Sequence, residues 1–149
     1  MSTSIQVFAE TRPVKWLMHF TRANNLDSIL ARGLVLRSTL IGEGFTECND
    51  QYRIDGTDAV CVSIGFPNYK LFYPLRQKYP QEQWVVLAIR REALWMLDCA
   101  FCSTNAASSE VKKIPISERR SVSALEAMFG DLPNKPRAEL GIPDYWPTN

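Results

Sequence analysis

The feature that most restricts the fold is a run of six apolar residues at positions 84–89, Trp-Val-Val-Leu-Ala-Ile. A short continuous apolar run of this kind predicts a central strand that is buried on both faces. No stretch of the chain approaches the roughly 18 charge-free apolar residues of a membrane span. Residues 1–20 also lack the basic start and apolar block of a signal peptide, so we expect a cytoplasmic protein.

The other elements are predicted from periodicity and from the placement of glycine and proline. Strands are predicted at residues 14–20 and 59–64, with a further strand or strand end at 99–103. Helices are predicted between the Asn24-Asn25 cap and Gly33, at 68–78, 91–97 and 123–128, with a long loop at 38–58 and an unpacked, extended tail after Gly130.

The chain length and this mixture of elements set the fold class. Because 149 residues have room for one core, we predict a single domain, residues 1–149. Its class is mixed α/β (α+β), with antiparallel pairing favoured at least as strongly as a doubly wound sheet. No strand is followed by a glycine-rich phosphate loop of the G-x-G-x-x-G or Walker type.

His19 is the only histidine in the chain. Along the predicted strand it shares a face with Leu17 and Thr21, so an imidazole and a hydroxyl project together from the strand end. This pair could hold the ribose or amide of a ligand. Alternatively, His19 is a core histidine with a backbone partner, and the residues alone favour this second interpretation. No serine lies in a G-x-S-x-G elbow, so acyl transfer is poorly supported.

Charge is segregated along the chain although the net charge is only +1. Arg53 is the one base in the acidic loop at 38–58. Its guanidinium could clamp a phosphate or polarise a substrate, or form a weak surface ion pair with a neighbouring aspartate. Basic residues concentrate at 69–91 and 111–120. These segments could form a phosphate-binding face or a solvated surface.

Aromatic residues accompany the first of these basic segments. Tyr69, Phe72 and Tyr73 recur at helical spacing. This spacing predicts the buried face of an amphipathic helix, in preference to a platform for unstacked bases. The basic residues among them remain a possible track for a phosphate backbone.

The four cysteines do not form a convincing metal site. Cys99-Ala-Phe-Cys102 has the spacing of a zinc knuckle, but Cys48 and Cys61 do not make a second one. The pair also lies in an apolar segment, where buried thiols are common. We therefore expect free thiols and no metal.

Five motifs occur in a distinctive order. The first is Met-His-Phe-Thr at 18–21, followed by Asn-Leu-x-x-Ile-Leu-x-x-Gly-Leu at 25–34. Next come the polar loop with Arg53, a strand–Pro–aromatic stretch at 60–73, and Phe-x-x-x-Asn-Ala-Ala at 101–107. The tail runs from Met-Phe-Gly at 128–130 to Gly-Ile-Pro-x-Tyr at 141–145. Together they resemble the DarT family of DNA ADP-ribosyltransferase toxins over nearly the whole chain.

The resemblance implies an ADP-ribosyltransferase fold, which is a split, strongly bent β-sheet with flanking helices. NAD+ would lie in the cleft as co-substrate. The likeness implies that His19 bonds to the NAD ribose, that the backbone of Phe20 contacts the nicotinamide amide, and that Thr21 supports them. Asn25 and Gly33 would line the nucleotide site.

The resemblance also implies a catalytic role for Arg53, in nicotinamide release or in activation of the accepting base. The implied acceptor is a base in single-stranded DNA. The residues expected to bind that strand are Arg90, Asn105, Lys112 and Lys113. A cognate antitoxin protein is the other expected partner, and no membrane is involved.

The family carries a glutamate in a Gln-Ala-Glu strand just after a Tyr-x-Pro-x-Asn tail, and residues 1–149 contain no such strand. Glu110, Glu126 and Glu139 do not sit in such a motif. We therefore expect a C-terminally incomplete domain that is inactive or crippled in this form. The alternatives are a non-catalytic module that binds NAD or nucleic acid on the same fold, or a transferase acting on RNA or protein.

Overall fold

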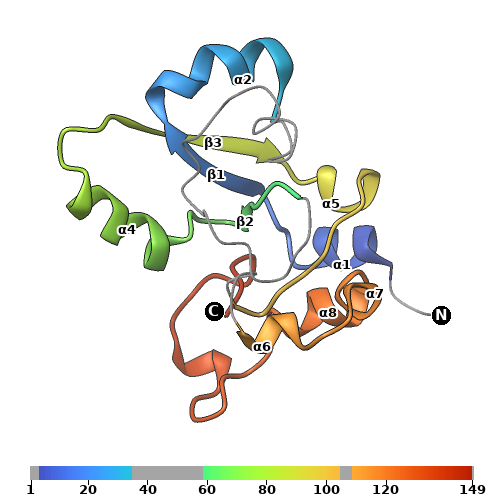
Figure 1. Ribbon diagram of the computed structural model, residues 1–149. Coiled ribbons are helices and arrows are strands. Elements are labelled where there is room, and N and C mark those ends of the chain that lie inside the picture. The colour runs from blue at the N-terminus through green and yellow to red at the C-terminus, as the bar shows by residue number, and fades with distance from the viewer. Residues whose placement is uncertain (1–3, 35–58, 105–108, 149) are drawn as a thin grey trace.

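A computed structural model describes residues 4–34, 59–104 and 109–148 (Figure 1). Its sheet has three antiparallel strands in the order β2-β1-β3, formed by β1 (Trp16–Arg22), β2 (Ser63–Ile64) and β3 (Trp84–Arg90). With several helices around this sheet, the predicted mixed α+β class is confirmed. The antiparallel arrangement is also confirmed.

The central strand is β1, and the prediction that residues 84–89 form a central strand buried on both faces is wrong. Within the described residues β3 pairs with β1 alone, at the edge of the sheet. Its alternate residues Val86, Ala88 and Arg90 are exposed, Val86 by 44%. Valine and alanine on the outer face keep the run apolar without burying it, so the sequence pattern could not distinguish an edge strand from a central one.

The two edges of β1 are paired very unequally. All seven residues of β1 have partners on β3, from Trp16 opposite Arg90 to Arg22 opposite Trp84. On the other edge, the predicted strand at 59–64 shortens to two residues, and its pairing stops at Met18 opposite Ser63. Over the residues that the structure describes, the sheet is therefore continuous on one side of β1 and open on the other.

The helices agree largely with the predictions. Around the sheet lie α1 (Ile5–Thr11), η1 (Ala23–Asn25), α2 (Leu26–Arg32), α4 (Tyr69–Lys78), α5 (Ala93–Met96), α6 (Ser109–Lys112), α7 (Ile116–Arg119), α8 (Val122–Ala127) and η2 (Arg137–Glu139). None of the described helices is both long and apolar enough to cross a membrane. Figure 1 shows α4 and the group of α1, α5, α7 and α8 at opposite ends of the sheet.

The hydrophobic core lies beside the first half of β1. It is built from Ala9, Val14, Leu17, Ile64, Leu94, Phe101, Leu125 and Phe129. Leu17 faces it from the sheet, and α1, α5 and α8 cover it from the other side. By contrast, α2 contributes no buried residue, and Leu30 is 74% exposed. The apolar stripe of that helix therefore does not reach the core.

Two further predictions need correction. Residues 99–103 form no strand; the Phe101 N–H donates to the Arg119 carbonyl at 2.7 Å, which joins this segment to the end of α7 and not to the sheet. The tail after Gly130 is packed, not loose. The Trp146 ring lies 5.0 Å from the Phe66 ring, and the Thr148 N–H donates to the Met128 carbonyl at 2.7 Å. Prolines prevented a regular helix in this tail without preventing packing.

Candidate functional site

The candidate site is the end of β1 where its pairing with β2 has stopped. The Nδ1 of His19 lies 2.7 Å from the carbonyl oxygen of Cys61. A carbonyl only accepts, so Nδ1 carries the proton in this bond, and Nε2 of the neutral ring is an acceptor. No described residue bonds to Nε2. His19 thus has the backbone partner of a core histidine and a ring nitrogen still available to a ligand.

Burial sets the charge of this imidazole. Desolvation lowers the pKa of His19 below its usual 6.5, and the bond to the Cys61 carbonyl opposes this shift. The ring is therefore neutral at physiological pH, with its tautomer fixed by Cys61. The sequence could not have identified Cys61 as the anchor, because the contact uses a backbone oxygen that is independent of residue type.

Thr21 and Asn25 are joined, as their four-residue separation allows. The Asn25 amide Nδ2 donates to the Thr21 hydroxyl at 3.0 Å, and Thr21 is only 7% exposed. Asn25 was predicted to cap the following helix, but its side chain makes no capping bond there. Instead it fastens the start of α2 to the end of β1.

The backbone of Phe20 faces the open edge of the sheet. The Gly65 N–H donates to the Trp16 carbonyl and the Ala23 N–H to the Gln83 carbonyl, each at 2.8 Å. Because such bonds alternate along an antiparallel strand, the even-numbered residues of β1 present their backbone groups to the β2 side. The register would place Phe20 opposite Cys61, beyond the end of β2. Among the described residues, no backbone group pairs with the amide of Phe20 on this edge.

The Phe20 ring joins the sheet to α4. It stacks on the Phe72 ring at 4.4 Å and meets the Trp84 ring edge-on at 6.1 Å. Phe72 is buried, as predicted for the core face of this helix, but Tyr69 and Tyr73 are 58% and 57% exposed. The prediction that all three rings are buried is wrong for both tyrosines, since Phe72 is the one buried residue of α4.

Gly33 ends α2 and has a conformation that needs glycine. Its φ is +76° and its ψ is −172°, a region that residues with a Cβ rarely adopt. A Cβ added there would meet nothing within 4 Å, so the requirement comes from the backbone and not from lack of space. This glycine therefore sets the direction in which the chain leaves α2.

Of the remaining predicted residues, some lie outside the described part of the chain and the others lie on different elements. Arg53 and Asn105 lie outside the described residues. Arg90 is exposed and pairs in register with Trp16, at the end of β3 remote from Phe20. Lys112 ends α6, and the exposed Lys113 forms an ion pair with Glu110 at 3.3 Å. Figure 1 shows α6 well away from β3, so the structure does not join these cations into one patch.

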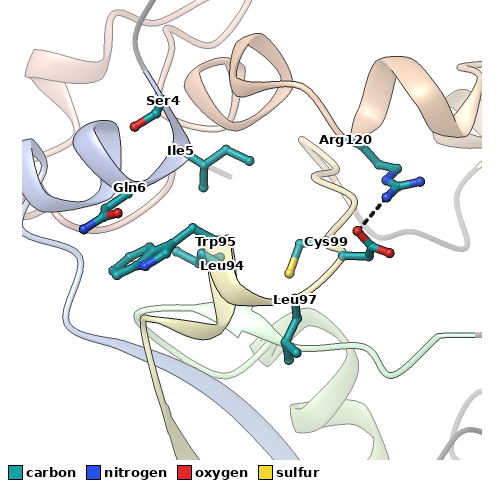
Figure 2. Close-up of a pocket in the computed structure, with 9 residues that line it drawn as sticks. Ser4, Ile5, Gln6, Leu94, Trp95, Leu97, Cys99 and Arg120 are labelled. Atoms are coloured by element: carbon teal, nitrogen blue, oxygen red, sulfur yellow. Dashed lines mark hydrogen bonds and ion pairs between the residues drawn. The ribbon is translucent and has the colours of Figure 1, made fainter.

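A concave region lies away from His19, between α1, α5 and the end of α7. It is an open hollow of about 430 Å³ whose walls include Ile5, Trp95 and Leu97, with the Asp98–Arg120 ion pair at 2.6 Å on its border (Figure 2). Cys99 is the one thiol in its lining, and burial together with Asp98 raises the pKa of that thiol. A protonated thiol is a poor nucleophile, so we place no chemistry in this hollow.

Metal binding finds no support in the described part of the chain. Cys61, Cys99 and Cys102 form no disulfide, and Cys48 lies outside the described residues. The described histidine, cysteine, aspartate and glutamate side chains form no group of three that could hold an ion.

Comparison with protein families gives one match. The family described as "ssDNA thymidine ADP-ribosyltransferase, DarT" matches residues 18–131. The matched region includes β1, η1, α2, β2, α4, β3 and the helices through α8. No match was found among curated proteins. The open end of β1 lies within the matched residues.

Proposed function

Because the chain belongs to the DarT family of single-stranded DNA thymidine ADP-ribosyltransferases, we propose that the open end of β1 is its NAD+ site. The observation that carries this proposal is that two neighbouring groups have no hydrogen-bond partner among the described residues: Nε2 of His19 and the backbone amide of Phe20. A neutral acceptor and an open strand edge fit a ribose hydroxyl and a carboxamide, which are the polar groups on the nicotinamide side of NAD+.

Each residue then has a specific task. His19 accepts a hydrogen bond from a ribose hydroxyl. The backbone of Phe20 bonds to the nicotinamide amide, which takes the place that a residue of a longer β2 would occupy. Thr21 and Asn25, bonded to each other, keep the end of β1 and the start of α2 in a fixed relation. Gly33 directs the chain after α2 along the nucleotide, and Arg53 supports nicotinamide release or activates the accepting base.

The chemistry is a group transfer that depends on positioning. NAD+ supplies the ADP-ribosyl group, and departure of nicotinamide develops positive charge on the ribose. The protein must hold NAD+ in a bent conformation and exclude water from the ribose while the accepting base attacks. The tautomer of His19 is fixed before the ligand arrives, so its acceptor needs no rearrangement.

The acceptor we propose is a base in single-stranded DNA, with Arg90, Asn105, Lys112 and Lys113 contacting the strand. The wider role is that of a toxin with a cognate antitoxin protein. Residues 1–149 hold no Gln-Ala-Glu strand, so we expect transfer by this segment to be weak. Transferases of the same fold acting on RNA or protein differ only in the acceptor.

One observation favours a second candidate, a non-catalytic NAD-binding module. The influences on the His19 pKa are burial and the Cys61 carbonyl, and neither is a carboxylate. No described acid is therefore close enough to His19 to affect it, whereas stabilising a cationic ribose calls for negative charge.

The test measures NAD+ binding and transfer separately. Residues 1–149, with and without the family's glutamate strand appended, are incubated with labelled NAD+ and equal amounts of single-stranded DNA, RNA and protein. We expect His19-dependent NAD+ binding in both forms and DNA labelling that is stronger in the extended form. Binding without labelling in either form would support the module. An absence of NAD+ binding, or binding unchanged by His19→Ala, would overturn the proposed site.

A further inference from the structure

Helix α4 carries an exposed aromatic face that the proposed NAD+ site does not use. Tyr69 and Tyr73 are more than half exposed, on the same side of the helix as the buried Phe72. The Tyr69 ring is 6.1 Å from the Phe66 ring. Two neighbouring rings left exposed on one helix form an aromatic surface that a ligand could cover.

The charge of this helix has one sign. Its cations are Lys70, Arg76 and Lys78, and none of its ten residues is acidic. The Arg76 guanidinium lies 4.5 Å from the centre of the Phe72 ring and 5.9 Å from that of Tyr73. Cations and exposed rings are thus interleaved, although the whole chain is almost neutral.

The same face begins at the proposed site. Phe72 stacks on Phe20, whose backbone faces the open edge of β1. A polymer lying along α4 would therefore reach the place where the ribose is held. Figure 1 shows α4 at the end of the sheet remote from α5 and α8, so this helix is not covered by the core helices.

We infer that the exposed face of α4 is the track for the acceptor single strand, with Tyr69 and Tyr73 stacking on its bases and Lys70 and Arg76 holding its phosphates. This inference rests on the proposed function for the identity of the acceptor. Unpaired bases offer flat faces to tyrosine rings, whereas duplex DNA keeps its bases stacked inside. The run of cations without acids complements the phosphate backbone and disfavours a basic protein partner.

The experiment measures DNA binding without NAD+ and NAD+ binding without DNA. Fluorescence anisotropy measures the affinity for a labelled oligothymidine of about twelve nucleotides. It compares the unmodified chain with Y69A/Y73A and Y69F/Y73F. Because each alanine removes a ring on which a base stacks, we expect the alanine pair to bind the strand at least about tenfold more weakly. The phenylalanine pair retains both rings, so its affinity stays within about twofold.

The cations are tested by salt dependence. R76Q removes one phosphate contact, so the slope of log affinity against log salt falls by about 0.7. The matched controls are K135Q for an exposed cation and M96A for an exposed apolar residue, both outside α4. We expect both controls to bind the strand as the unmodified chain does, and a duplex of the same sequence to compete poorly.

Three results would overturn the inference. One is unchanged oligonucleotide binding by folded Y69A/Y73A, with folding checked by circular dichroism and thermal unfolding. Another is no oligonucleotide binding by the unmodified chain. The third is a loss of NAD+ affinity with unchanged DNA affinity, which would assign the rings to the nicotinamide. Failure of the proposed NAD+ site would instead appear as absent NAD+ binding with the DNA results intact.

Discussion

The geometry of His19 is compatible with both interpretations of this residue, a core histidine with a backbone partner and a histidine that binds a ligand. His19 is a core histidine with a backbone partner, because Nδ1 donates to Cys61. That same bond leaves Nε2 as a neutral acceptor facing away from its partner. The structural contact thus leaves the ring with the acceptor that the proposed NAD+ site requires.

The lowered pKa of His19 predicts a pH dependence of stability. The native ring resists protonation down to a pH below 6.5, whereas the unfolded chain takes up the proton near 6.5. The unfolded state therefore binds more protons in the interval below 6.5, and the free energy of unfolding decreases as the pH falls through it. Urea denaturation between pH 5 and 7.5 should show a slope of at most about 1.4 kcal/mol per pH unit, which His19→Gln removes. An unchanged slope in this variant would contradict the assignment.

The Thr21–Asn25 bond predicts a selective effect of removing a hydroxyl. Thr21→Val keeps the shape of this buried side chain but leaves the Asn25 amide without its acceptor. We expect a loss of about 1 kcal/mol in the free energy of unfolding, and weaker NAD+ binding as the start of α2 loosens. Thr21→Ser is the control, because it keeps the hydroxyl. Equal NAD+ affinity in all three proteins would show that this bond only stabilises the fold.

Among the elements, α2 is held in place by contacts at its two ends more than by burial of one of its faces. It has no buried residue, and Asn25 and Gly33 hold it at its two ends. We predict that Gly33→Ala destabilises the protein by about 1–3 kcal/mol, because alanine is strained at a φ of +76°. Gly130→Ala is the matched control, since its Cβ would lie an ordinary 3.5 Å from the Ala127 carbonyl oxygen. Thermal unfolding that gave equal losses for both variants would argue against a conformational role for Gly33.

The sequence predicted which segments become elements better than it predicted how they pair. The strand around His19, the helix ending before Tyr79 and the stop at Gly33 all follow from local signals, and the structure confirms them. The edge position of β3 does not follow, because an apolar run is compatible with either place in a sheet. The exposure of Tyr69 and Tyr73 also depends on a distant partner, the sheet, which periodicity cannot describe.

Only the side chains of the candidate site could be predicted from the sequence, and its backbone groups could not. His19 and Thr21 stand out by residue type and spacing, and the structure brings them to one strand end. The Cys61 oxygen and the Phe20 amide are backbone groups, which no residue type marks. Their availability depends on where β2 stops, and strand ends are set by pairing across the sheet.

At the level of the whole molecule, the C-terminal tail is fastened to the sheet by an aromatic contact. The Trp146 ring packs on Phe66, and it lies so close to Gly65 that an added Cβ would be 2.7 Å from Cδ1 of Trp146. The Lys15 ammonium also lies 4.5 Å from the centre of the Tyr145 ring. Residues 65–66 directly follow β2, so the tail and the short strand support each other.

We predict that Trp146→Ala releases the tail. Limited proteolysis should cut residues 131–148 faster than in the unmodified chain, with a loss of about 3 kcal/mol in the free energy of unfolding. The control is Tyr145→Phe, which keeps the ring over which Lys15 lies. Unaltered cleavage rates in Trp146→Ala would mean that the bond from Thr148 to Met128 suffices to hold the tail.

The shortness of β2 limits how far the stability of this protein can be raised without loss of ligand affinity. Lengthening β2 by two residues would add backbone bonds to β1 and so favour the folded state, yet those bonds would occupy the amide of Phe20. If the proposed NAD+ site is correct, stability and ligand affinity compete for the same few backbone atoms. Substitutions at positions 61 and 62 that raise the melting temperature by extending this ladder should weaken NAD+ binding, a trade-off between stability and activity located at one strand edge.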